Sequence, residues 1–82
     1  MTEAAIRERI LVLLCDEGLD RERALEERNL AAVIDSLKLL ELTAAIEESL
    51  QRTIPDDEMT EQNFASIPAM MQMIGRLSSD PV

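Results

Sequence analysis

Apolar residues recur at helical spacing in three stretches of the chain, and no stretch alternates between apolar and polar residues as a strand would. The first stretch covers residues 3–16, where Thr2 can cap the start of a helix and Gly18 can end it in a left-handed conformation. Its expected buried positions are Ile6, Ile10, Leu13 and Leu14. The pattern predicts an N-terminal amphipathic helix.

The second stretch begins at Asp35 and Ser36, which are both good N-cap residues. We expect this helix to end near Arg52, because Pro55 disfavours helical geometry at the residue before it. One stripe of the helix should be buried: Leu39, Leu42, Ile46 and Leu50. A second stripe beside it mixes apolar and acidic residues: Leu37, Glu41, Ala44, Glu47 and Glu48.

The third stretch begins at Ser66, a candidate cap, and tolerates Pro68 in the first turn of its helix. Its expected buried face consists of Ile67, Met70, Met71, Ile74 and Leu77. Residues 78–82 are expected to form a frayed tail.

Two connections separate these helices. Residues 18–35 form the longer one, with a turn of helix expected around 21–27 and five apolar residues expected to hold it to the core: Leu19, Leu25, Leu30, Val33 and Ile34. Residues 56–60 are expected to be an acidic loop, after which Thr60 can cap a short helix reaching Phe64. The predicted fold class is all-α, a small bundle of three main helices plus one short helix, in a single domain over residues 1–82.

Composition restricts the classes of function. The chain has no His, and its single cysteine, Cys15, excludes an internal disulfide and a thiolate zinc site. Cys15 follows a run of apolar residues and is expected to be a small buried side chain. We expect no catalytic or metal-binding set, and hence no enzyme. With no membrane-spanning stretch and no signal peptide, a cytoplasmic location is the default expectation.

Charge is distributed unevenly along the chain. The formal net charge is −9, which argues against nucleic acid as a partner, because binding phosphates requires a basic surface. Between residues 35 and 61 there are eight acidic residues and only two basic ones, Lys38 and Arg52. This acidic half could steer basic partners, or it could simply keep a small protein in solution.

Four blocks follow one another from the second predicted helix onward: Asp35-Ser36-Leu37, Leu40-Glu41-Leu42, Ala45-Ile46-Glu47-Glu48 and Ile54-Pro55-Asp56-Asp57-Glu58. In the order and spacing of these blocks the chain resembles the acyl carrier protein family. The first helix matches the family by its apolar pattern only.

The resemblance implies that Ser36 carries a covalent 4'-phosphopantetheine arm, transferred from coenzyme A by a phosphopantetheinyl transferase that also recognises Asp35 and Leu37. Acyl groups would be held on the arm as thioesters and presented to loading and transferring enzymes with basic patches. The residues that match the partner-binding stripe of the family are Leu37, Glu41, Ala44, Glu47 and Glu48. Lys38, which departs from the family pattern, is expected to bind partners as well. The expected carrier is a monomer.

Physical chemistry gives this assignment of Ser36 a rationale. A phosphodiester at the start of a helix meets unpaired backbone N–H groups and the positive end of the helix dipole. The sequence offers no base to activate Ser36 as a nucleophile, so Ser36 is interpreted as the substrate of another enzyme.

Two departures from the family pattern point away from bulk fatty acid synthesis. Val33-Ile34 precede the Asp-Ser-Leu block where such carriers usually have Gly, and Lys38 follows it where they have an acid. We therefore expect a free-standing carrier of a specialised pathway, with Lys38 discriminating among partners by repulsion. A peptidyl or D-alanyl carrier and an unmodified adaptor that acts only by binding remain alternatives. The later methionines are interpreted either as core filling or as a core that opens for a guest: Met59, Met70, Met71 and Met73.

Overall fold

The computed structural model describes residues 2–16 and 18–79. Within these ranges the chain is all-α, as predicted, with no strand. Three helices of 13 to 15 residues form the bundle: α1 (Glu3–Asp16), α4 (Ser36–Leu50) and α5 (Ile67–Ser79). The short elements are α2 (Arg21–Glu26), α3 (Leu30–Val33) and the 3-10 turn η1 (Asp56–Glu58).

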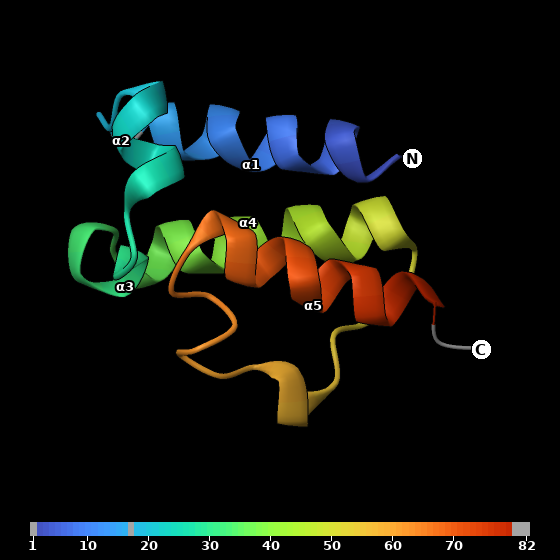
Figure 1. Cartoon of the computed structure of the whole chain (residues 1–82). Coiled ribbons are helices and arrows are strands. Elements are labelled where there is room, and N and C mark those ends of the chain that lie inside the picture. The colour runs from blue at the N-terminus through green and yellow to red at the C-terminus, as the bar shows by residue number, and fades with distance from the viewer. Residues whose placement is uncertain (1, 17, 80–82) are drawn as a thin grey trace.

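Helix α1 runs against α4, whereas α4 and α5 run in the same direction (Figure 1). Two helices that run in the same direction need a return connection as long as the helices themselves. Residues 51–66 provide it and lie on the side of the bundle away from α1 in this view (Figure 1). This segment has no α-helix, and only its η1 turn is regular.

The core lies between the three long helices and, apart from the ring of Phe64, consists of aliphatic and methionine side chains. Its largest fully buried side chains come from each of them, and Leu30 adds one from α3: Ile6, Ile10, Leu11, Leu14, Leu30, Leu42, Ile46, Ile67, Met70, Met73 and Ile74. Met70 and Met73 are therefore core residues, whereas Met59 is 42% exposed. Burial of a side chain of this size stabilises the fold by about 1.5–3 kcal/mol.

The helix boundaries follow local signals that the sequence contains. Thr2 Oγ1 accepts a hydrogen bond from the Ala5 N–H at 3.2 Å, and Ser66 Oγ accepts one from the Ala69 N–H at 3.1 Å. Gly18 has a φ of +99°, which confirms the left-handed position predicted there. Helix α4 ends two residues earlier than expected, because Gln51 adopts the left-handed conformation and its N–H bonds to a helix carbonyl.

Several sequence predictions are wrong. Cys15 is exposed rather than buried. It lies in the last turn of α1, beyond Leu14, which is the last buried residue of that helix. Leu25 is exposed, although it was expected to pack against the core. The short helix expected to reach Phe64 is only a turn. Of the expected frayed tail, Ser78 and Ser79 belong to α5, and residues 80–82 lie outside the described residues.

Candidate functional site

Ser36 is the first residue of α4 and is exposed. The N-cap is Asp35 alone, whose Oδ1 accepts a hydrogen bond from the Lys38 N–H at 2.8 Å. The backbone N–H groups of Ser36 and Leu37 precede the first helical hydrogen bond, so they remain available to an anion. The site predicted from the sequence therefore has the local geometry that favours a phosphate group.

Ser36 has no activating base in the described part of the chain. Its hydroxyl makes no hydrogen bond to any described residue. Asp35 is engaged with the helix backbone, and Glu61 lines the same hollow as Ser36 without bonding to it. A serine in this setting is accessible to another enzyme but is not itself prepared for nucleophilic attack.

Ser36 lines the first of two adjoining hollows. The first, of about 210 Å³, is lined by Ile34, Asp35, Ser36, Leu39 and Glu61. The second, of about 170 Å³, is lined by Leu39, Met59, Thr60, Glu61 and Phe64. Because they share two lining residues, they are neighbours between α4 and the connection that follows it. The sequence did not reveal Glu61 as part of this site, since only the folded connection brings it to Ser36.

The mixed stripe predicted on α4 is on the surface, but its acidic residues already have partners. Glu41 Oε2 accepts a hydrogen bond from the Lys38 ammonium at 3.0 Å. Glu47 Oε2 accepts one from the Ile54 N–H at 2.8 Å. The third acid, Glu48, pairs with an arginine of α1 at 3.0 Å. The charge that the stripe offers to a partner is thus smaller than a count of carboxylates indicates.

Leucines dominate the exposed part of the same face. Leu37 and Leu40 are each 65% exposed, and Ala44 is exposed as well. Their spacing of three and four residues places them on one ridge of the helix. Leu40 is a surface residue that the sequence analysis did not assign to the stripe. The spacing from Leu37 could have identified it.

Lys38 lies where the sequence analysis did not expect it. Only 8% of the residue is exposed, although it was expected to face approaching enzymes. Its aliphatic stem is buried while its ammonium reaches Glu41 within the same helix. In this position the ammonium of Lys38 offsets the negative charge of Glu41 in the same helix. Because so little of Lys38 is exposed, little of it is available for direct contact with a partner enzyme.

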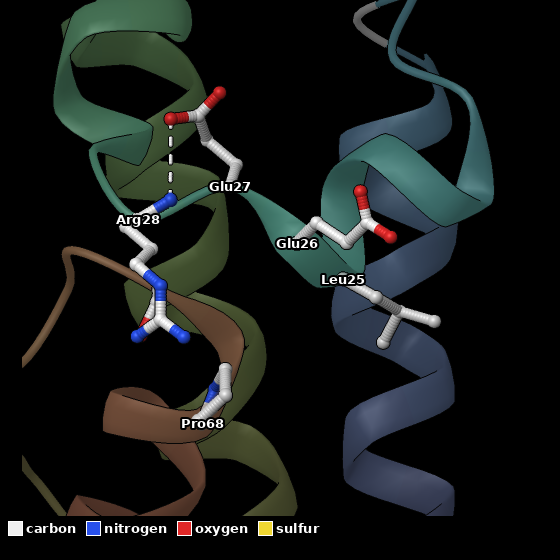
Figure 2. Close-up of a pocket in the computed structure, with 6 residues that line it drawn as sticks. Leu25, Glu26, Glu27, Arg28 and Pro68 are labelled. Atoms are coloured by element: carbon white, nitrogen blue, oxygen red, sulfur yellow. Dashed lines mark hydrogen bonds between the residues drawn. The ribbon is translucent and has the colours of Figure 1, made fainter.

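A separate hollow of about 350 Å³ lies between the end of α2 and the start of α5 (Figure 2). Leu25 and Glu26 line it from α2, and Pro68 lines it from α5 (Figure 2). Glu27 and Arg28 line the hollow as well, and the Glu27 carboxylate accepts a hydrogen bond from the backbone N–H of Arg28. None of the site residues predicted from the sequence lies here.

Comparisons with protein-family models, with curated proteins and with solved structures find no match to this chain. None of the helices in residues 2–16 and 18–79 has both the length and the apolar character needed to cross a bilayer. The same residues contain no cluster of three or more carboxylate or thiol side chains arranged to hold a metal ion.

Proposed function

We propose that this chain is an acyl carrier protein that holds acyl groups as thioesters on a 4'-phosphopantetheine arm attached to Ser36. The observation that carries the proposal is an exposed serine at the first position of a 15-residue helix, beside a hollow and without a base of its own. The four sequence blocks around Ser36 that resemble the family support the same reading.

The attachment is a reaction performed by a transferase on Ser36. The Ser36 oxygen forms a bond to the phosphorus that carries the pantetheine part of coenzyme A. The pyrophosphate bond breaks, adenosine 3',5'-bisphosphate leaves, and the transferase takes the hydroxyl proton. The new phosphodiester lies at the N-terminus of α4, where the free N–H groups of Ser36 and Leu37 stabilise its negative charge.

Partner enzymes would meet the face of α4 that starts at Ser36. The exposed residues Leu37, Leu40 and Ala44 offer apolar contact there. The net charge of −9 speeds the approach of basic partners at long range, which suits brief encounters with several enzymes. We place the carrier in a specialised pathway, because Lys38 reduces the negative charge next to the attachment site.

The test is to incubate the protein with coenzyme A and a broad-specificity phosphopantetheinyl transferase and to measure the intact mass. We expect the mass of one arm to be added, on the peptide that contains Ser36. Ser36→Ala should abolish the addition, and the matched control Ser49→Ala, in the same helix, should retain it. An unchanged wild-type mass, or an arm on another serine, would contradict the proposal and favour an adaptor that acts only by binding.

A further inference from the structure

The exposed face of α4 has an apolar ridge that continues into an acidic residue. Leu37 and Leu40 are each 65% exposed, and Ala44, one turn after Leu40, is exposed as well. These three residues are called the α4 ridge below. Glu48 follows Ala44 by one more turn, so it lies at the end of the ridge. Glu41 lies one turn after Leu37 and borders the ridge at its middle.

Each of these two carboxylates is paired with a cation of the chain itself. The ammonium of Lys38 donates to Glu41 Oε2 at 3.0 Å. Helix α1 lies against α4, and from it Arg9 Nη2 donates to Glu48 Oε2 at 3.0 Å. Arg9 Nη1 also donates to Ser49 Oγ at 3.5 Å, so the guanidinium spans two neighbouring residues of α4. The charge of both carboxylates is therefore offset before any partner arrives.

Arg9 and Lys38 differ in what their removal would disturb. Lys38 has only 10% of its side chain exposed, so its stem is part of the packing beneath α4. Arg9 has 38% of its side chain exposed, and its partner Glu48 has 72%. Exposed ion pairs of this kind contribute little to stability. The main consequence of Arg9 is therefore the charge that Glu48 presents to a partner.

This pairing changes which contacts are favourable at the α4 ridge. The net charge of −9 still attracts a basic surface from a distance. At contact, however, a partner's arginine that reaches Glu48 has to displace Arg9, and one guanidinium is merely exchanged for another. Leu37 and Leu40 have no such competitor, and a partner that covers them gains their apolar area. Apolar contact is therefore the stronger source of affinity at this face.

We infer that Arg9 is a specificity-determining residue. It masks Glu48, so that the α4 ridge favours an enzyme whose docking surface is an apolar groove over one that needs an ion pair there. This inference rests on the proposed function, because the enzyme would dock in order to reach the arm on Ser36. Arg9 acts through Glu48, which lies near the opposite end of α4 from Ser36.

The first experiment measures the masking and does not require the arm. A tetra-arginine peptide is titrated into isotope-labelled protein, and the backbone amide shift of Glu48 reports the affinity there. In Arg9→Gln we expect the peptide to bind at Glu48 about threefold more tightly than in wild type. The matched control is Arg21→Gln, which changes the net charge equally but releases Glu8 instead. An affinity at Glu48 that stays at the wild-type value in Arg9→Gln, or rises equally in Arg21→Gln, overturns the inference.

Sedimentation velocity checks the competing occupant of the α4 ridge, a second copy of this chain. We expect wild type to sediment as a monomer. A dimer that dissociates on Leu40→Glu would show that a second copy covers the ridge, and it would overturn the inference.

The last experiment measures docking by enzymes. Two phosphopantetheinyl transferases are compared, chosen because the docking surface of one is apolar and that of the other is basic. With the apolar enzyme, Leu40→Ala should raise KM about fivefold and leave kcat unchanged. The control Leu25→Ala removes an exposed leucine of α2 and should keep the wild-type KM. An unchanged KM in Leu40→Ala overturns the inference.

The two enzymes together test the role of Arg9. Wild type should be the better substrate of the apolar enzyme. Arg9→Gln should shift the ratio of kcat/KM values about threefold toward the basic enzyme in low salt, and salt should reverse the shift. The same ratio in Arg9→Gln and Arg21→Gln overturns the inference. If neither enzyme attaches an arm to wild type, the proposed function fails instead, and the peptide titration decides on the masking alone.

Discussion

Helix α4 and the connection of residues 51–66 are consecutive in the chain and form opposite walls of the same hollow. They are held in place by different means. Helix α4 has its own cap at Asp35, a left-handed end at Gln51 and a face buried in the core. The connection has two anchors in the core, Ile54 and Phe64, and a polar network to α5 between them. The connection also has hydrogen bonds within its own turns, but its attachment to the rest of the molecule depends on residues far away in the sequence.

This difference indicates which wall can move. Local hydrogen bonds and core packing hold α4 as a unit, so its exposed face keeps a constant shape. The connection can separate from α5 without breaking any helix, because its contacts in the middle are few and polar. The wall that carries Ser36 is therefore rigid, and the wall opposite it can adjust. The following predictions test this contrast.

Phe64→Ala should have the largest effect. Removing this buried ring takes away one of the two core anchors of the connection, and such changes cost about 3–5 kcal/mol. The melting temperature should fall by more than about 10 °C. The control is Met59→Ala in the same connection, where partial exposure limits the cost to about 1 kcal/mol. A Phe64→Ala protein as stable as the control would show that the connection does not depend on its anchors.

Lys38→Asp should be the next most disruptive change, by about 1–3 kcal/mol, because it puts a carboxylate in a poorly exposed position beside Glu41. An acid in the first turn of a helix gains only about 0.3–1 kcal/mol from the helix dipole, which is too little to compensate. Chemical denaturation measures the loss. Lys38→Met, which keeps the stem and removes the charge, should stay within about 1 kcal/mol of wild type. Equal stability of Lys38→Asp and wild type would mean that Lys38 is effectively a surface residue.

Asp35→Ala should cost about 0.5–2 kcal/mol, since it removes the hydrogen bond to the Lys38 N–H that caps α4. Ser36→Ala, one residue later, should change stability by less than about 0.5 kcal/mol, because its hydroxyl is not part of the cap. Urea unfolding of the two variants separates the structural role of Asp35 from the proposed chemical role of Ser36. A larger loss in Ser36→Ala than in Asp35→Ala would reverse these roles.

Acid should weaken the ion pair between Arg76 and Glu58, with a small effect on overall stability. The pKa of Glu58 is lower in the folded protein than its usual value of 4.5, so its ion pair stabilises the fold above that pH. This contribution is lost as the pH falls below 4.5 and through the lowered pKa. The difference in melting temperature between wild type and Arg76→Gln should therefore be present at pH 6 and shrink below pH 4.5. A difference that is independent of pH would contradict an ionic contribution from Glu58.

Much of the helical framework could be predicted from the sequence, because the signals are local. Thr2 and Ser66 cap the helices that follow them, Gly18 has the predicted left-handed conformation, and Ser36 begins its helix as expected. Hydrogen bonds of this kind span three or four residues, so the information needed to predict them lies within one turn of helix.

The surroundings of Ser36 depended on contacts between residues far apart in the chain, and for these the sequence was insufficient. Glu61 reaches the hollow at Ser36 only because the return connection folds back along α4, and Arg76 reaches Glu58 across 18 residues. The exposure of Cys15 and the burial of Lys38 likewise depend on which helix packs against which face. Periodicity identifies an apolar stripe, but the neighbouring elements decide how wide the buried face becomes. Local signals are therefore enough to predict the helices and the candidate serine, whereas the surroundings of that serine depend on how distant segments pack together.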